Sequence, residues 1–201
     1  VSKFTNIFES EICKLSKARY AVATINGTSA LEISIKALNI SKNSEILIPN
    51  LNYIASSNAV LYNNCIPHFV DADINNLGID YEKLDKYLEK NFIKEKFLIN
   101  KKTKRKVEAI IPTHIFGYSS DIGKLLKLKK KYNLKIIEDA SECVGSFYKG
   151  KHLGTFGDIG VLSFNGNKII TTGGGGAIIS NNKNIYKKAF SLCTIFRKKK
   201  N

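Results

Sequence analysis

The stretch LKIIEDASECVGSFYKGKHLGTFGDIGVLSFNGNKIITTGGGGAIIS, residues 134–180, decides the fold. It contains three short apolar runs, at 134–137, 160–164 and 177–180, each bounded by glycine or polar residues. Runs of this length predict β-strands that are buried in a sheet. Carboxylates follow the first run, and a lysine loop with a glycine turn joins the second run to the third. We therefore expect the chemistry of this chain at the ends of these strands.

On the N-terminal side of this stretch, apolar runs alternate with segments of helical period. This alternation is typical of βα units and predicts a single α/β domain with a mainly parallel sheet. Further strands are expected at 20–24, 46–48, 66–70 and 107–112. Helices are expected at 28–38, 55–63, 81–91, 121–132 and 183–196. The third of these helices is expected to begin after Asp80, which acts as its N-cap.

The composition is that of a globular chain. The 201 residues are 43% hydrophobic, which suffices for a sizeable core. No run approaches the roughly 20 apolar residues that a membrane-spanning helix needs, and the N-terminus is charged, so a cytoplasmic location is expected. The four cysteines lie far apart without a CxxC pair, which predicts neither a metal site nor a disulfide framework.

The net charge of +15 raises the question of a polyanionic partner. Lysines gather at 101–106, 127–132 and 197–200, in segments that otherwise have the features of a loop, a helix surface and the chain end. Because the charge is spread over separate elements, we do not expect nucleic-acid binding. A basic nucleic-acid-binding domain is kept as an alternative, and the charge could instead attract an anionic nucleotide substrate.

Two loops that follow strands carry residues suited to ligand binding. Gly27, Thr28 and Ser29 lie between a strand and a helix, where hydroxyls and free N–H groups form an anion site. A glycine turn with a helix cap would have the same sequence. Asp139 follows an apolar strand, where a buried carboxylate needs a cationic or hydrogen-bonding partner, although a helix-capping role is compatible with the same position.

A third loop, SFNGNK, places Lys168 before the glycine run 173–176. The small residues around it would let a flat ligand approach the backbone, but a single lysine is more often a solvated surface charge. The pattern is neither a GxGxxG turn after a first strand nor a P-loop, so dinucleotide and ATP sites are not indicated. Tyr53, His114 and Phe116 also follow strands, and packing is the simpler interpretation for each of them.

Six segments, taken in order, cover nearly the whole chain. They are NGTSAL (26–31), PNLNYIAS (49–56), FVDAD (69–73), PTHIFGYSSDI (112–122), IIEDASECVGS (136–146) and LGTFGDIGVLSFNGNKIITTGGGGAIIS (153–180). Together they resemble the large domain of the DegT/DnrJ/EryC1/StrS sugar aminotransferases. The resemblance implies the type I aminotransferase fold, a mainly parallel, mixed seven-stranded sheet between helices, with a small C-terminal domain and a dimer. We expect residues 1–201 to be the large domain, without the small one.

The resemblance also implies a cofactor, pyridoxal 5'-phosphate (PLP). Lys168 matches the lysine that forms the Schiff base with PLP and then moves the proton. Asp139 matches the carboxylate that pairs with the pyridine nitrogen and keeps the ring an electron sink. The implied ligands of the cofactor phosphate are Gly27, Thr28, Ser29 and Ser163.

Three other positions bear on the resemblance. Tyr53 matches an aromatic residue on the face of the cofactor, and Glu142 is an expected cofactor-binding residue near its phenolic oxygen. Many members of the family have Gln or His at the position of Glu142, and Glu at the position of Gly174. Both departures are similar to the subgroup that makes 4-amino-4,6-dideoxy sugars on routes of the legionaminic-acid type.

The implied function is transfer of an amino group, with glutamate as the expected donor, to a 4-keto-6-deoxy nucleotide sugar in the biosynthesis of cell-surface polysaccharide or glycan. A homodimer is the expected complete form. A sugar dehydratase or a non-catalytic relative of the same fold would bind PLP but would have another residue, usually His, in place of the Schiff-base lysine. The presence of Lys168 is therefore evidence against both. The nucleic-acid alternative predicts salt-sensitive oligonucleotide binding and no chromophore.

Overall fold

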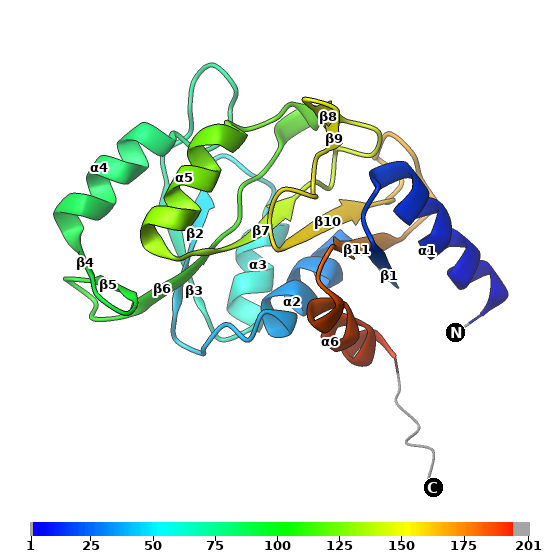
Figure 1. Cartoon of the computed structure of the whole chain (residues 1–201), viewed down its shortest axis with the longest axis horizontal. Coiled ribbons are helices and arrows are strands. Elements are labelled where there is room, and N and C mark those ends of the chain that lie inside the picture. Colours follow the sequence, from blue (N-terminus) through cyan, green and yellow to red (C-terminus); the bar gives the residue numbers. More distant parts are fainter. Residues whose placement is uncertain (1, 195–201) are drawn as a thin grey trace, which may run out of the picture.

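Seven strands form the continuous path of the central sheet in the computed structural model, which describes residues 2–194. They are β1 (Tyr20–Thr24), β2 (Glu45–Pro49), β3 (Ile66–Val70), β6 (Lys106–Ile110), β7 (Lys135–Asp139), β10 (Ile159–Ser163) and β11 (Gly176–Ser180). Their order across the sheet is β1-β11-β10-β7-β6-β2-β3 (Figure 1). All seven predicted strands are confirmed, and their ends differ from the expected ranges by at most two residues.

The strand directions place the loops of interest at one edge of the sheet. β11 is antiparallel to both of its neighbours, β1 and β10, whereas every other neighbouring pair on this path is parallel. The predicted mixed, mainly parallel sheet is therefore confirmed. The other six strands all end at the same edge, which we call the carboxyl edge. The loops after β1, β2, β6, β7 and β10 carry the candidate residues, and such edges are where α/β sheets bind ligands.

Two short hairpins were not predicted. β4 (Phe92–Lys94) pairs with β5 (Leu98–Asn100), which joins the main sheet beside β6 and brings that sheet to nine strands. β8 (Phe147–Tyr148) and β9 (Lys151–His152) form a separate two-stranded sheet. Strands of two or three residues are too short to show a period-two pattern in a sequence.

The five predicted helices are present, and within residues 2–194 two more helices lie outside the predicted ranges. They are α1 (Lys3–Ser16), α2 (Gly27–Ala37), α3 (Ala55–Tyr62), α4 (Tyr81–Asn91), α5 (Ile122–Tyr132) and α6 (Lys183–Cys193), with a short 3-10 helix η1 (Ile115–Gly117). The predicted N-cap of α4 is confirmed, because the Asp80 carboxylate accepts a hydrogen bond from the Lys83 N–H. The last helix was expected to reach residue 196, which lies outside the described residues.

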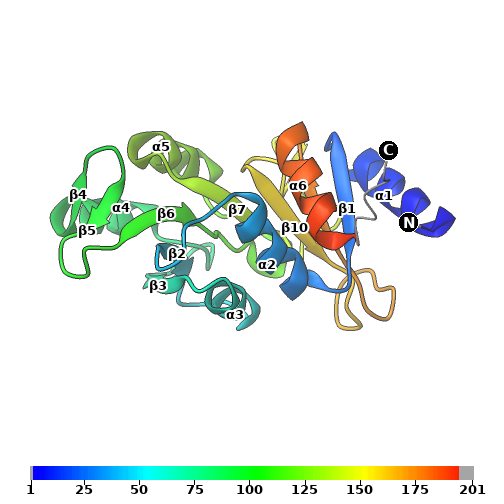
Figure 2. The same cartoon turned by 90° about the horizontal axis from the view of Figure 1, so that it is seen from below.

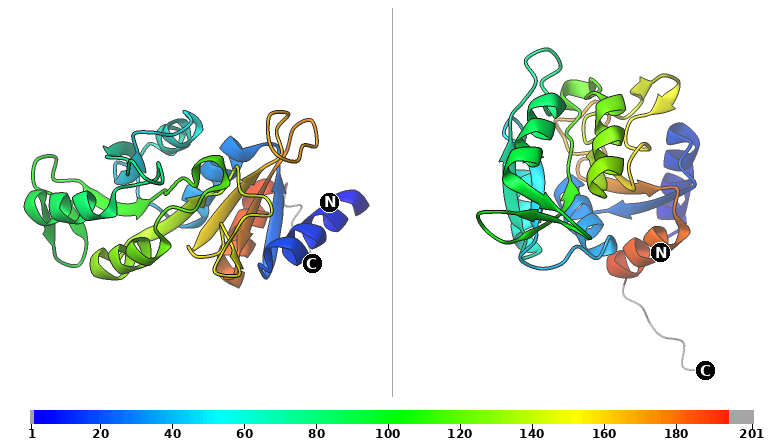
Figure 3. Two further views of the ribbon diagram at one scale, coloured as in Figure 1. Left: turned by 90° about the horizontal axis from the view of Figure 1, so that it is seen from above. Right: turned by 60° about the vertical axis from the view of Figure 1, so that its left-hand side comes forward.

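Helices cover both faces of the sheet. One apolar cluster packs α2, α3 and α6 against one face, and a second cluster packs α1, α4 and α5 against the other (Figures 2 and 3). Each central strand is therefore buried on both sides, and β2, β10 and β11 contain only buried residues. This explains why the strands are continuous apolar runs in the sequence rather than alternating patterns.

The basic runs lie on separate elements. Residues 101–106 form the turn between β5 and the start of β6, and residues 127–132 belong to α5. On α5, Lys131 pairs with Asp85 and Glu89, so part of that charge is matched. The run 197–200 lies outside the described residues. Within residues 2–194, none of the helices combines the length and the apolarity that crossing a membrane requires.

A buried carboxylate organises the opposite, amino edge of the sheet. Glu45, at the start of β2, is 2% exposed and accepts hydrogen bonds from Thr103, Asn100 and His68. These residues line a cavity of about 390 Å³ that is remote from the carboxyl edge. Burial raises the pKa of Glu45, but the hydrogen bonds from Thr103, Asn100 and His68 outweigh it, so the pKa lies below its usual value.

This lowered pKa predicts an acid-sensitive contribution to stability. Because the pKa of Glu45 is lower in the folded state than in the unfolded state, its carboxylate stabilises the fold at every pH above the unfolded-state pKa. That stabilisation is lost as the pH falls through the folded-state pKa. Replacing Glu45 with Gln should lower the free energy of unfolding at pH 7 by about 2–3 kcal/mol, because buried donors lose a charged acceptor. The difference from wild type should shrink between about pH 5 and pH 3, as urea unfolding would measure. Glu89→Gln, in an exposed pair, is the control. Parallel stability curves for wild type and Glu45→Gln would contradict this account.

Candidate functional site

The first turn of α2 forms one wall of the site at the carboxyl edge. Gly27 begins the helix, and the side chain of Asn26 caps it by accepting a hydrogen bond from the Ser29 N–H at 2.8 Å. Thr28 and Ser29 in the same turn are half-buried. The first backbone N–H groups of a helix have no partners within it, and the helix dipole favours negative charge there. This turn therefore has the properties of an anion-binding wall.

Close approach to β10 explains the glycine at the start of α2. A Cβ atom placed on Gly27 would lie 3.1 Å from the Cβ atom of Ser163 and 3.3 Å from the Oγ atom of Ser141. These distances are tighter than most contacts of a Cβ atom, so a larger residue here would require the two serine side chains to shift by a few tenths of an ångström. The predicted residues Gly27 and Ser163, which are far apart in the sequence, thus lie against each other, and their loops bring hydroxyls and N–H groups to one place.

Asp139 is the last residue of β7 and is 6% exposed. Its Oδ2 atom accepts a hydrogen bond from the Ser56 hydroxyl at 3.0 Å, and its Oδ1 atom accepts one from the Ser141 N–H at 3.2 Å. Side chains alternate along a strand, so Asp139 lies on the same face as Ile137, which packs under α2 and α3. Asp139 therefore presents a buried, hydrogen-bonded carboxylate at the end of the strand next to the Gly27–Ser163 contact.

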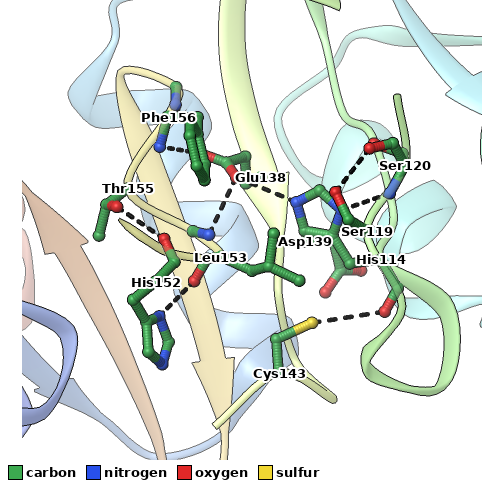
Figure 4. Close-up of polar contacts among 12 residues, drawn as sticks. His114, Ser119, Ser120, Glu138, Asp139, Cys143, His152, Leu153, Thr155 and Phe156 are labelled. Atoms are coloured by element: carbon green, nitrogen blue, oxygen red, sulfur yellow. Dashed lines mark hydrogen bonds and ion pairs between the residues drawn. The ribbon is translucent and has the colours of Figure 1, made fainter. Parts of the chain in front are cut away.

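The neighbouring residue, Glu138, points to the other face of the sheet and is wholly buried. Its carboxylate accepts hydrogen bonds from His114 Nε2 and from the backbone N–H groups of Gly154, Phe156 and Gly157 (Figure 4). The other ring nitrogen of His114 accepts from the Ser120 N–H, which leaves Nε2 as the donor to Glu138. His114 is thus part of the packed interior, in agreement with the simpler interpretation of that residue, and Glu138 ties the 152–157 loop to β7.

Lys168 lies in the connection between β10 and β11, and its side chain is only 15% exposed. Its Nζ atom donates a hydrogen bond to Glu142 Oε1 at 3.2 Å. The other carboxylate oxygen of Glu142 accepts from the Phe116 N–H at 2.7 Å. The Lys168 amine is therefore not a freely solvated surface charge. Glu142 links it to η1, so the loops after β6, β7 and β10 meet at this residue.

Tyr53 is the predicted site residue that the structure leaves most exposed. It lies in the loop between β2 and α3 at the carboxyl edge, and 75% of it is exposed. Its ring makes none of the aromatic contacts present among residues 2–194.

Three residues that had no role in the sequence interpretation support the site: Ser56 and Ser141, which hydrogen-bond to Asp139, and Glu138, which is buried on the other face of the sheet. Glu138 and Ser141 flank Asp139 in a segment that was already singled out, so their proximity to the site was accessible from the sequence. Ser56 lies at the end of the segment PNLNYIAS (49–56), but its hydrogen bond to Asp139, 83 positions away, leaves no signal in that segment.

Comparisons with known proteins agree on one family. The model of the DegT/DnrJ/EryC1/StrS aminotransferase family matches residues 2–201. GDP-perosamine synthase from Escherichia coli O157:H7 is 38% identical over 179 residues, which are 89% of this chain and 45% of that protein. The putative pyridoxal phosphate-dependent aminotransferase EpsN from Bacillus subtilis (strain 168) is 31% identical over 184 residues, covering 92% of this chain and 45% of that protein.

A solved structure supports the same assignment. The aminotransferase from Psychrobacter cryohalolentis is similar with a TM-score of 0.83 and 30% identity, over 94% of this chain and 44% of that one. The chain thus spans less than half the length of these relatives. The predicted fold and family are both confirmed: the chain belongs to the DegT/DnrJ/EryC1/StrS aminotransferase family.

Proposed function

We propose that this chain is the cofactor-binding part of a PLP-dependent aminotransferase that transfers an amino group to a 4-keto-6-deoxy nucleotide sugar. The product serves the biosynthesis of cell-surface polysaccharide or glycan. One observation carries the proposal. The buried carboxylate of Asp139, the amine of Lys168 and the Gly27–Ser163 contact lie at one edge of the sheet, on separate connections. The names of the relatives, a GDP-perosamine synthase and a pyridoxal phosphate-dependent aminotransferase, support the same chemistry.

The residues present fit PLP. The first turn of α2, with Thr28, Ser29 and Ser163, supplies N–H groups and hydroxyls for a phosphate. Asp139 supplies an anion for a protonated ring nitrogen. Beside it, Thr113 follows β6 and pairs with Asp139 in an isolated β-bridge, and its hydroxyl oxygen is buried without a hydrogen-bond partner among residues 2–194. An unpaired polar atom of this kind is expected in a wall that faces a ligand.

Bound PLP would supply an electron sink for cleavage of a C–H bond next to nitrogen. The chain's own residues would bind and orient the cofactor and would accept and donate the protons. Lys168 Nζ would hold the cofactor in the site and would accept and donate the proton that moves during the transfer. The Asp139 carboxylate would keep a proton on the ring nitrogen. Glu142, which accepts from both the Lys168 amine and the Phe116 N–H, holds the lysine in the site.

Glutamate as the amino donor, a cytoplasmic location and the legionaminic-type subgroup stay predictions, as does the division into a PLP-binding large domain at 1–201 and a separate small domain. A homodimer would cover apolar side chains that are exposed on loops at the carboxyl edge. These side chains are Ile25, Leu51, Tyr53, Phe116, Tyr118 and Ile169.

The proposal is tested on the full-length protein with PLP, glutamate labelled with ¹⁵N in its amino group, and a GDP-linked 4-keto-6-deoxy sugar. Mass spectrometry is expected to find the label in an amino sugar. Consumption of the sugar without incorporation of nitrogen would indicate a dehydratase instead. Salt-sensitive binding of oligonucleotides, together with no visible absorbance after addition of PLP, would favour the basic nucleic-acid-binding alternative.

A further inference from the structure

Ser56 touches the proposed partner of the cofactor ring but has no role so far. It is the second residue of α3 and has no exposed surface. Its hydroxyl donates to Asp139 Oδ2 at 3.0 Å, across a separation of 83 positions in the sequence. The other carboxylate oxygen, Oδ1, accepts from the Ser141 N–H at 3.2 Å. Asp139 is therefore held by one donor from α3 and by one donor from its own loop.

Two donors on two different oxygens fix the rotation of a carboxylate. The terminal torsion of an Asp side chain is otherwise broad, because it joins an sp³ carbon to an sp² carbon. With the Ser141 N–H as the only donor, the carboxylate could rotate about its terminal torsion, because Oδ2 would have lost its hydrogen bond from Ser56. Each carboxylate oxygen has two acceptor positions, so both oxygens can still accept a further hydrogen bond in this orientation.

We propose that Ser56 is a positioning residue for the reaction. Its hydroxyl holds the Asp139 carboxylate in the orientation that receives the N–H of the cofactor ring. This inference rests on the proposed function, in which a PLP ring nitrogen pairs with Asp139. It differs from a purely structural role of Ser56, which would affect only the stability of the fold.

The experiment compares full-length wild type with Ser56→Ala and with Ser57→Ala, the adjacent buried serine of α3, which makes no hydrogen bond to Asp139 among the described residues. Ser56→Ala is expected to bind PLP and to keep its KM for the sugar, but to lower kcat by about tenfold or more, as expected for losing a hydrogen bond to a charged group. The pH midpoint of the bound cofactor's visible absorbance should also shift. Ser57→Ala should match wild type in both quantities.

The outcomes separate this inference from the proposed function. A wild-type protein that gains no absorbance with PLP would overturn both. If wild type binds PLP and Ser56→Ala keeps the wild-type kcat and pH midpoint, with or without a loss of thermal stability, Ser56 is structural only and the inference is wrong. Should Ser56→Ala fail to fold, Ser56→Cys keeps a similar volume with a much weaker donor, and the same two quantities decide.

Discussion

Replacing Lys168 with arginine is expected to lower the rate of amino transfer by about 10³-fold or more. A guanidinium group keeps the positive charge and can still pair with Glu142, but it does not lose its proton in proteins, so it neither bonds to the cofactor's aldehyde nor moves a proton. The fold should change little, because the Lys168–Glu142 pair is partly exposed on the glutamate side and such pairs contribute little to stability.

The lysine itself is identified by reduction with borohydride in the presence of PLP, followed by peptide mapping. We expect the stable adduct on Lys168 in the wild type and none in Lys168→Arg. Lys151→Arg, which changes an exposed lysine on β9, is the matched control and should keep both the label and the activity. A label on any other lysine, or a visible absorbance without any label, would contradict the assignment.

Replacing Asp139 with asparagine is expected to leave PLP bound and to lower kcat by on the order of 10²-fold or more, or about 3 kcal/mol of transition-state stabilisation. The amide is neutral, so it does not hold a proton on the ring nitrogen, and the ring then withdraws electrons less well. Its carbonyl oxygen can still accept a hydrogen bond from Ser56 or Ser141, which limits the disturbance of the fold.

The measurement is steady-state turnover of the full-length variant, with cofactor content followed by absorbance. Asp85→Asn is the matched control, because Asp85 lies on α4 and pairs with Lys131, away from the carboxyl edge. This control should retain wild-type turnover. Near-normal turnover by Asp139→Asn with PLP bound would show that another residue pairs with the ring nitrogen.

The predicted strands were accurate because burial on both faces leaves a strong local signal. β2 and β11 are continuous apolar runs in the sequence, with every residue buried in the structure. Such runs need no knowledge of their neighbours to be recognised. The β4–β5 hairpin escaped prediction for the opposite reason. Its strands have three residues each, and they are held in part by the network around Glu45, whose partners come from β3 and from the loop after β5.

The sequence by itself determined the α/β class, the mainly parallel sheet and the family, because these depend on apolar periodicity and on motif order along the chain. Only the tertiary structure decided which polar residues meet. Ser56 reaches Asp139 because α3 packs on the face of the sheet to which Asp139 points, and Glu138 turns away because side chains alternate along β7. Hydrogen bonds between loops depend on strand order and helix packing, and neither leaves a local pattern in the sequence.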